Sequence, residues 1–268
     1  VGGYASGPTL WAAAHRGVPT LIQEQNSYAG VTNKLLASKA HTICVAYDGM
    51  ERFFPAEKLV LTGNPVRQDL CNEALTRTEA AAFFGFAPNK KIILLIGGSL
   101  GALTLNTAVA ESISEIVKRG VQLIWQCGKR FDERAKMVLE AAGNPTCIKQ
   151  MPFIARMDLA YKAADLVISR AGASSISELC LLGKPVILVP SPNVAEDHQT
   201  KNAEALSSKG AAILVRDTEA RQRLMPCALS VVHDEESLTS MSREIAALAQ
   251  RDSAARIADI IFDIVNKK

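Results

Sequence analysis

The sequence predicts an α/β protein in which parallel sheets form two successive units. Short β-branched runs alternate with amphipathic segments along the chain, and this alternation is typical of strand-helix-strand repeats. The runs at 92–96 and 186–189 are apolar at every position, as strands covered on both faces must be. A Gly- and Pro-rich break at Gly63-Asn64-Pro65-Val66-Arg67 separates the two units.

The individual elements follow from the same alternation. Strands are expected at residues 19–22, 42–45, 58–61, 91–96, 121–126, 146–148, 166–169, 185–189 and 211–215. Helices are expected at residues 7–15, 30–38, 102–118, 132–141, 157–164, 174–182 and 199–208, and the chain after Val215 should be helical through 236–250 and 253–266.

The break defines the expected domains. Thr76 and Glu79 form a capping-box pattern that opens a new helix after it. Residues 1–66 are too few for a complete doubly wound domain, so they are expected to be the remainder of a larger one. The chain also opens on Val1-Gly2-Gly3 without a Met, and we expect sequence upstream of it.

Composition excludes several classes of function. A net charge of +3 and an aromatic content of 5% disfavour nucleic-acid binding. The six cysteines form no C-x-x-C pair, so zinc-site spacing is absent and reduced thiols are expected. No apolar run reaches the length of a membrane span, and no signal peptide is visible.

The segment Gly97-Gly98-Ser99-Leu100-Gly101-Ala102 predicts a diphosphate site. It follows a buried strand and opens a helix, so backbone N–H groups and the helix N-terminus can meet an anion. It is not a P-loop, and no acidic residue ends the next strand as a dinucleotide fold would require. A tight strand-to-helix turn without a ligand is the alternative.

The segment from Ser169 to Glu178 predicts a second wall of the site. Small residues turn the chain into a helix, and Glu178 lies about one turn inside it, where a carboxylate can accept hydrogen bonds from both hydroxyls of a ribose. A Glu that only interacts with the helix dipole is the alternative.

Two polar loops complete the pattern. His198, Gln199 and Asn202 follow the strand at 185–189 and should face the same crevice, although Asp197 would also serve as a helix N-cap. Gln23-Glu24-Gln25-Asn26 follows the strand at 19–22, and Asn26 suits a sugar hydroxyl or acetamide. A solvated loop and a surface histidine are the alternatives.

Taken together, these loops resemble the MurG family of cell-wall glycosyltransferases over essentially the whole chain. The resemblance rests on the following segments: Gly2-Gly3-Tyr4-x-Ser6-Gly7-Pro8, Glu24-Gln25-Asn26, Gly63-Asn64-Pro65-Val66-Arg67, Gly97-Gly98-Ser99-x-Gly101-Ala102, Arg170-x-Gly172-Ala173 with Glu178, and Asp197-His198-Gln199-x-x-Asn202. It implies the GT-B fold, with two Rossmann-like domains of which the N-terminal one is incomplete here. The domains would be 1–66 on the acceptor side, 67–250 on the UDP-sugar side, and a C-terminal helix, 251–268, returning to the first.

The resemblance also implies the reaction. The family moves GlcNAc from UDP-GlcNAc to the 4-hydroxyl of the MurNAc sugar of lipid I, giving lipid II with inversion, in peptidoglycan synthesis. It needs no metal or other cofactor, and it works as a peripheral protein on the cytoplasmic face of the bacterial inner membrane. The implied partners are UDP-GlcNAc, lipid I and that membrane face, without nucleic acid.

The resemblance assigns substrate-binding roles by position. Glu178 would hold the ribose hydroxyls, Ile154 would present its backbone to uracil, and Phe153 would flank the nucleoside. The diphosphate would meet Ser99, Gly98 and Gly101, with Arg67 nearby. The remaining expected contacts are, for GlcNAc, Asn26, Ala173, His198 and Gln199, and, for the nucleotide pocket, Met157 and Ser175. Ser174 and Asn202 are also expected to bind the substrate.

An inverting transfer needs a base for the acceptor hydroxyl. The family's glycine-rich loop with a histidine, taken to supply the base, has no counterpart in this sequence, and Glu24 is only a weak substitute. We therefore expect donor binding with poor turnover on a lipid I analogue. The alternatives are a UDP-GlcNAc 2-epimerase, a nucleotide-binding oxidoreductase, and a non-catalytic donor-binding subunit.

Overall fold

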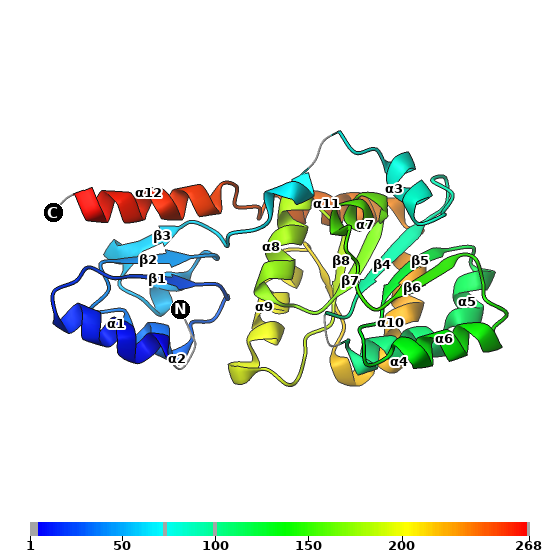
Figure 1. Cartoon of the computed structure of the whole chain (residues 1–268), viewed down its shortest axis with the longest axis horizontal. Helices are drawn as coiled ribbons and strands as arrows, with labels where there is room; N and C mark the ends of the chain where they lie inside the picture. Colours follow the sequence, from blue (N-terminus) through cyan, green and yellow to red (C-terminus); the bar gives the residue numbers. More distant parts are fainter. Residues whose placement is uncertain (1–4, 72–73, 99–100, 267–268) are drawn as a thin grey trace.

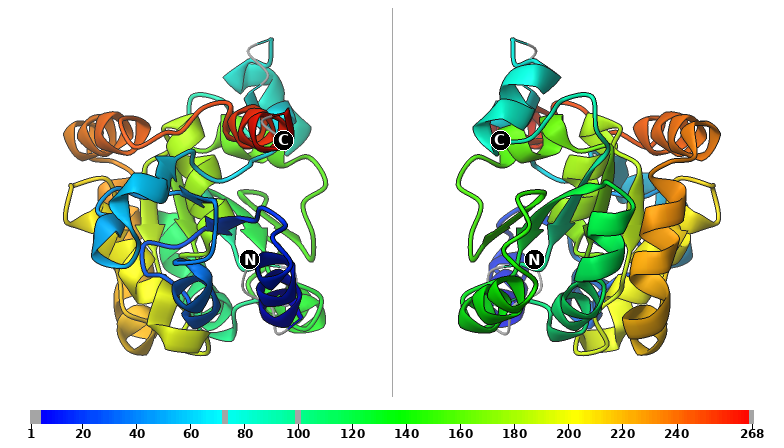
Figure 2. Two further views of the ribbon diagram at one scale, coloured as in Figure 1. Left: turned by 90° about the vertical axis from the view of Figure 1, so that its left-hand side faces the viewer. Right: turned by 90° about the vertical axis from the view of Figure 1, so that its right-hand side faces the viewer.

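The computed structural model describes residues 5–71, 74–98 and 101–266, and it shows two lobes that each contain a parallel sheet (Figure 1). The small sheet has the order β1-β2-β3, with β1 at Leu21–Glu24, β2 at Thr42–Val45 and β3 at Leu59–Leu61. Helices α1 (Ser6–His15), α2 (Val31–Leu36) and α12 (Ser253–Asn266) lie around this sheet, as the end-on view of Figure 2 shows.

The large sheet has the order β6-β5-β4-β7-β8-β9, and all of its pairings are parallel. In chain order within the lobe this is the doubly wound arrangement 3-2-1-4-5-6. The strands are β4 (Ile92–Ile96), β5 (Gln122–Gln126), β6 (Ile148–Met151), β7 (Leu166–Ser169), β8 (Val186–Leu188) and β9 (Ile213–Leu214). The direction of winding therefore reverses between β4 and β7.

Helices cover both faces of the large sheet and bury its strands. One face packs against α4 (Leu103–Glu111), α5 (Ile113–Lys118), α6 (Asp132–Ala141) and α10 (Asp217–Val231). The other packs against α3 (Arg77–Phe83), α7 (Met157–Ala163), α8 (Ala173–Leu182) and α9 (His198–Ser207). Helix α11 (Glu235–Ala246) contributes to both cores. Four consecutive residues of β4 are fully buried, which explains its unbroken apolar pattern and confirms the predicted parallel α/β class.

One predicted helix is divided in the structure. The helix expected over 102–118 ends at Glu111 and begins again at Ile113, because Ser112 has φ −113° and ψ 8° and belongs to neither. Serine is a poor residue for a helix interior, since its hydroxyl competes for backbone groups. The periodic apolar pattern runs through this interruption, so periodicity alone did not reveal it.

The capping box at the start of α3 is present as predicted. The Thr76 side chain accepts from the Glu79 N–H, and the Glu79 carboxylate accepts from the Thr76 N–H at 2.9 Å. We expect Thr76→Ala to lower the free energy of unfolding by about 1 kcal/mol, measured by urea denaturation. Ser112→Ala is the matched control, because the Ser112 hydroxyl caps nothing at α5, and it should change stability by less than about 0.5 kcal/mol. Equal effects of the two substitutions would contradict a stabilising cap.

The segments that join the two lobes pack closely against each other. Gly63 has φ +79°, and a Cβ at this position would lie 2.3 Å from Gln250 Cβ and 2.6 Å from Ser253 Oγ. Only glycine fits this crossing. Beyond Gln250 the chain enters α12. There Arg256 Nη2 donates to the Leu61 carbonyl at 2.6 Å and connects the helix to the end of β3. Within residues 5–71, 74–98 and 101–266, no helix is both long and apolar enough to span a bilayer.

Candidate functional site

The point where the winding of the large sheet reverses brings two of the predicted loops side by side. Strands β4 and β7 are neighbours, and their last residues, Ile96 and Ser169, are partners in the register. The glycine loop follows Ile96 directly, and the loop into α8 follows Ser169. Ligands of open α/β sheets bind in the crevice beyond the strand ends at such a reversal.

The glycine loop approaches the end of β5 too closely for side chains. A Cβ on Gly97 would lie 3.0 Å from the Gln126 carbonyl oxygen, and one on Gly101 would lie 2.4 Å from that of Cys127. Gly101 and Gly98 both have positive φ, +77° and +76°, but a Cβ on Gly98 would meet nothing within 4 Å. The loop therefore has a packed side at Gly101 and an open side at Gly98. Ser99 and Leu100 lie outside the described residues.

A buried polar network behind this loop was not predicted from the sequence. Asn106 is 1% exposed, and its Nδ2 donates to the Cys127 carbonyl at 2.7 Å. Its Oδ1 accepts from Trp125 Nε1 at 2.8 Å. The network fixes the carbonyl against which Gly101 packs. An asparagine inside a helix with apolar neighbours was the only available indication of it.

Helix α8 presents an uncapped N-terminus to the same crevice. Its N-cap residue is Gly172, which has no side chain to cap the helix, and a Cβ there would meet nothing within 4 Å. Ala173, Ser174 and Ser175 form the first turn, with Ser174 exposed and the other two partly buried. The unpaired N–H groups of this turn are available to a ligand.

Glu178 lies one turn further along α8 and is oriented by two side chains. Its Oε2 accepts from the Tyr161 hydroxyl at 3.0 Å, and its Oε1 lies 3.7 Å from Arg67 Nε. Burial and, after it, the Glu178 charge raise the pKa of Tyr161, so this hydroxyl stays a donor. Arg67 is half-exposed, so the ion pair contributes little stability but places a cation beside the carboxylate. Tyr161 was not anticipated, because an aromatic residue on an apolar helix face is usually a core residue.

The loop after β6 separates its two predicted site residues. The Phe153 side chain is 63% exposed, whereas Ile154 is 2% exposed and belongs to the core. Phe153 can therefore flank a ligand with its ring, and Ile154 can offer only its backbone. Met157 begins α7 and packs partly against the same core.

The loop after β8 leads into α9 and carries the predicted site residues His198 and Gln199. Asp197 is the N-cap of α9 with φ +53°, and its carboxylate accepts from Thr200 Oγ1 at 2.6 Å. His198 Nε2 lies 3.4 Å from Glu196 Oε2, while its Nδ1 is buried without a partner among the described residues. Gln199 Oε1 accepts from the Ser191 N–H at 2.9 Å. A buried ring nitrogen without a partner is consistent with a ligand-binding position.

Asn202 connects the two lobes rather than facing an open crevice. It is fully buried, its Oδ1 accepts from the Ser27 N–H at 2.9 Å, and its Nδ2 donates to Asn26 Oδ1 at 3.0 Å. The same Nδ2 lies 3.3 Å from the Ala171 carbonyl in the loop after β7. One amide thus joins the small-lobe loop that carries Asn26 to the wall that carries Glu178.

Glu24 is enclosed by donors from its own loop. Its carboxylate is 3% exposed and accepts from the N–H groups of Asn26 and Gly30, at 3.0 and 2.9 Å, and from Asn33 Nδ2 at 2.8 Å. These bonds hold the turn that presents Asn26 to Asn202. The surroundings therefore favour a role for Glu24 in shaping the loop over that of a base.

The comparisons with known proteins agree with this arrangement. The model of the glycosyltransferase family 28 C-terminal domain matches residues 92–257, and that of the N-terminal domain matches residues 1–45. A UDP-N-acetylglucosamine–N-acetylmuramyl-(pentapeptide) pyrophosphoryl-undecaprenol N-acetylglucosamine transferase of Parabacteroides distasonis is 62% identical over the whole chain and 73% of its own length. The protein of the same name from Cytophaga hutchinsonii is 49% identical over 99% of the chain and 71% of its own length.

Solved structures show the same fold. The crystal structure of Acinetobacter baumannii MurG aligns with a TM-score of 0.77 and 32% identity, over 98% of this chain and 73% of that one. A putative UDP-N-acetylglucosamine 2-epimerase from Listeria monocytogenes aligns with a TM-score of 0.69 but 15% identity, over 98% of this chain and 72% of that one, which shows a shared fold alone. The predicted GT-B architecture is confirmed, and the chain belongs to the MurG family of glycosyltransferases.

Proposed function

We propose that this protein transfers GlcNAc from UDP-GlcNAc to the 4-hydroxyl of the MurNAc sugar of lipid I, forming lipid II for peptidoglycan with inversion at the anomeric carbon. The names of its relatives, at up to 62% identity, support this reaction over the 2-epimerase, oxidoreductase and non-catalytic alternatives. The observation that carries the proposal is the pairing of the glycine loop with the Glu178 helix at the reversal of a six-stranded sheet.

The chemistry of the donor half follows from that pairing. Negative charge builds on the β-phosphate as UDP leaves, and preorganised donors that meet it lower the barrier. The N–H groups near Gly98 and in the first turn of α8 are such donors, with Ser99 as a further hydroxyl donor and Arg67 as the nearby cation. The Gly101 N–H donates to the Gly98 carbonyl at 3.1 Å, so Gly101 shapes the loop. No metal cofactor forms part of this proposal.

We assign the remaining donor contacts as follows. Glu178 binds the two ribose hydroxyls, Phe153 and the Ile154 backbone hold the uracil, and Met157 lines the nucleotide pocket. The GlcNAc contacts are assigned to Asn26, Ala173, His198, Gln199 and, through its hold on Asn26, Asn202. The catalytic base stays unassigned, since the hydrogen bonds around Glu24 disfavour it.

We also propose the domain limits and the place of action. Residues 1–66 belong to the acceptor-side domain, 67–250 to the donor-binding domain, and 251–268 to the helix that packs back on the first. The partners are UDP-GlcNAc, lipid I and the cytoplasmic face of the inner membrane, where the protein acts as a peripheral enzyme, and nucleic acid is not among them.

Glu178→Ala tests the donor site. The substitution removes an acceptor for two ribose hydroxyls, so UDP affinity measured by calorimetry should fall by roughly 1.5–3 kcal/mol. Tyr161→Phe is the matched control, because it removes only the hydrogen bond that orients the carboxylate, and it should weaken UDP by less than about 1 kcal/mol. The unaltered protein should bind UDP and UDP-GlcNAc but not NAD. Unchanged UDP affinity in Glu178→Ala would contradict the assignment of Glu178 to the ribose hydroxyls.

A further inference from the structure

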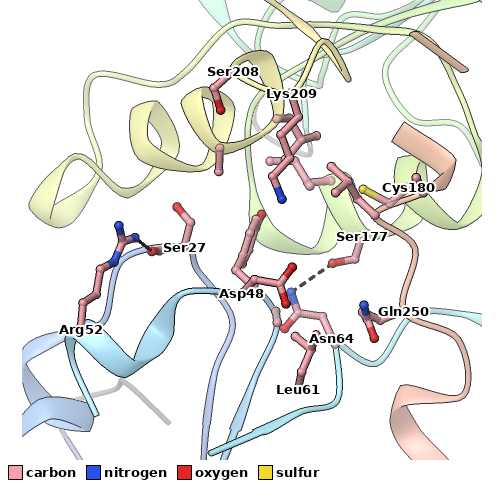
Figure 3. A pocket seen from close by; sticks show the side chains of 18 residues that line it. Ser27, Asp48, Arg52, Leu61, Asn64, Ser177, Cys180, Ser208, Lys209 and Gln250 are labelled. Carbon is pink, nitrogen blue, oxygen red and sulfur yellow. Dashed lines mark hydrogen bonds between the residues drawn. The ribbon is translucent and has the colours of Figure 1, made fainter. Parts of the chain in front are cut away.

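A cavity lies at the junction of the two lobes (Figure 3). Its volume is about 250 Å³, and both lobes line it. The small lobe contributes residues after β2 and at the end of β3, and the large lobe contributes α8, the end of α9 and the segment 247–250. None of the residues assigned above to the donor lines this cavity, so it is a separate site.

One wall of the cavity is apolar, and two of the polar side chains in the lining are already paired. Ile176, Leu206 and Leu248 form apolar wall. Asn64 Nδ2 donates to the Ser177 hydroxyl at 3.0 Å, and the Ser177 hydroxyl donates to the Ala173 carbonyl at 2.9 Å. These two side chains bridge the lobes and leave little hydrogen-bonding capacity for a ligand.

Burial also makes the Cys180 side chain part of the apolar wall. It raises the pKa of Cys180 to about 12, so the thiol stays protonated at neutral pH. A protonated buried thiol behaves as a small hydrophobic group. The cavity therefore favours an apolar body against α8.

Two of the lining side chains, Tyr47 and Lys209, end in hydrogen-bond donors. The Tyr47 hydroxyl is buried and has no hydrogen-bond partner among the described residues. Burial raises the pKa of Tyr47, so its proton is retained. Lys209, just beyond α9, directs its ammonium group into the cavity in Figure 3. Arg52 is held by the Ser27 carbonyl at 2.8 Å, and in Figure 3 the Asp48 carboxylate points toward the side of the cavity that carries Asn64.

We propose that this cavity is a binding site for a small organic anion, a carboxylate carried on an apolar body. The apolar part would pack against α8 and Leu248, and the carboxylate would accept from the Tyr47 hydroxyl and the Lys209 ammonium. The lining residues include two cations, Arg52 and Lys209, against one carboxylate, Asp48, which favours an anion over a cation. The volume suits a single-ring compound rather than a nucleotide sugar.

An occupant would also influence the relation between the lobes. The walls come from both lobes, so a bound molecule stabilises the arrangement in which they meet. Ser177 lines this cavity and is the neighbour of Glu178 on α8, which faces the proposed donor site. Occupancy is thus positioned to affect donor binding through one helix.

Fluorine NMR with three probes that share a 4-fluorophenyl ring and differ in the charge of the polar group tests the site. The probes are 4-fluorobenzoate, 4-fluorobenzyl alcohol and 4-fluorobenzylamine, added to the whole chain. We expect the benzoate to bind most tightly, the alcohol about fivefold more weakly, and the amine more weakly still. Saturating UDP should leave the benzoate bound, because the two sites share no residue. Tightest binding by the amine, or displacement of the benzoate by UDP, would overturn the proposal.

Single substitutions then locate the probe. Lys209→Gln and Tyr47→Phe should each weaken the benzoate about fivefold, and Asp48→Asn should tighten it about twofold. In Lys209→Gln the alcohol should bind as before, which shows that the cavity is intact. Benzoate binding that none of these three substitutions alters would contradict the assignment.

Discussion

Replacing Gly101 with alanine is expected to disable the donor site and to lower the free energy of unfolding by about 3 kcal/mol. Alanine at φ +77° costs about 1–2 kcal/mol by itself. The new methyl group would also lie 2.4 Å from the Cys127 carbonyl oxygen. That oxygen cannot easily move, because Asn106 Nδ2 holds it at 2.7 Å and Asn106 is in turn held by Trp125. Overpacking of this kind typically costs 1–3 kcal/mol.

The consequence for binding follows from the position of the loop. If the loop shifts to relieve the contact, its N–H groups no longer converge on the diphosphate. We expect UDP affinity to fall at least tenfold, about 1.4 kcal/mol, while uridine is affected much less. Calorimetry with UDP and with uridine measures the change in affinity, and denaturant unfolding measures the change in the free energy of unfolding.

Gly98→Ala distinguishes the cost of the positive φ from the cost of the steric clash with the Cys127 carbonyl oxygen. Gly98 has nearly the same φ, +76°, but a Cβ there meets nothing within 4 Å. Gly98→Ala should therefore cost only about 1–2 kcal/mol of stability, which comes from the backbone conformation alone. If Gly98→Ala and Gly101→Ala prove equally destabilising, the close approach to Cys127 is not what requires glycine.

Replacing Asn202 with alanine is expected to loosen the contact between the lobes and to weaken binding of the sugar. The substitution leaves the Ser27 N–H without its partner in a buried place and Asn26 Oδ1 without its partner in a part-buried one. Unpaired buried groups cost about 1–3 kcal/mol each, so the free energy of unfolding should fall by about 2–4 kcal/mol. Because Asn26 then loses its fixed position, UDP-GlcNAc should bind about tenfold more weakly, and UDP alone nearly as before.

Ser177→Ala is the matched control for this contact. It removes a different hydrogen bond between the lobes, the one from Asn64, which is only partly buried. We expect a loss of about 1 kcal/mol and an unchanged ratio of UDP-GlcNAc to UDP affinity. A UDP-GlcNAc affinity that is unaffected by Asn202→Ala would refute a positioning role for Asn202.

The fold was accessible from the sequence because local patterns determine strands and helices. Strands β2 and β7 and helices α6 and α12 begin and end at the predicted residues, since their apolar runs are bounded by clear turn or capping residues. Strand β6 was expected at 146–148 and lies at Ile148–Met151 instead. Its burial pattern is mostly open, as at a sheet edge, so its sequence carries a weaker pattern.

The sequence by itself determined the α/β class, the two units and the loops that meet at the proposed donor site. It did so because these loops follow predicted strands, at the end of a parallel sheet where ligands bind, and occur together in one order along the chain. The tertiary structure alone decided which side chains meet. Tyr161 and Arg67 reach Glu178 from separate elements, and Asn202 reaches Ser27 across 175 positions of sequence. Such contacts depend on how two lobes pack, and no local pattern of hydrophobicity or turn residues encodes that packing.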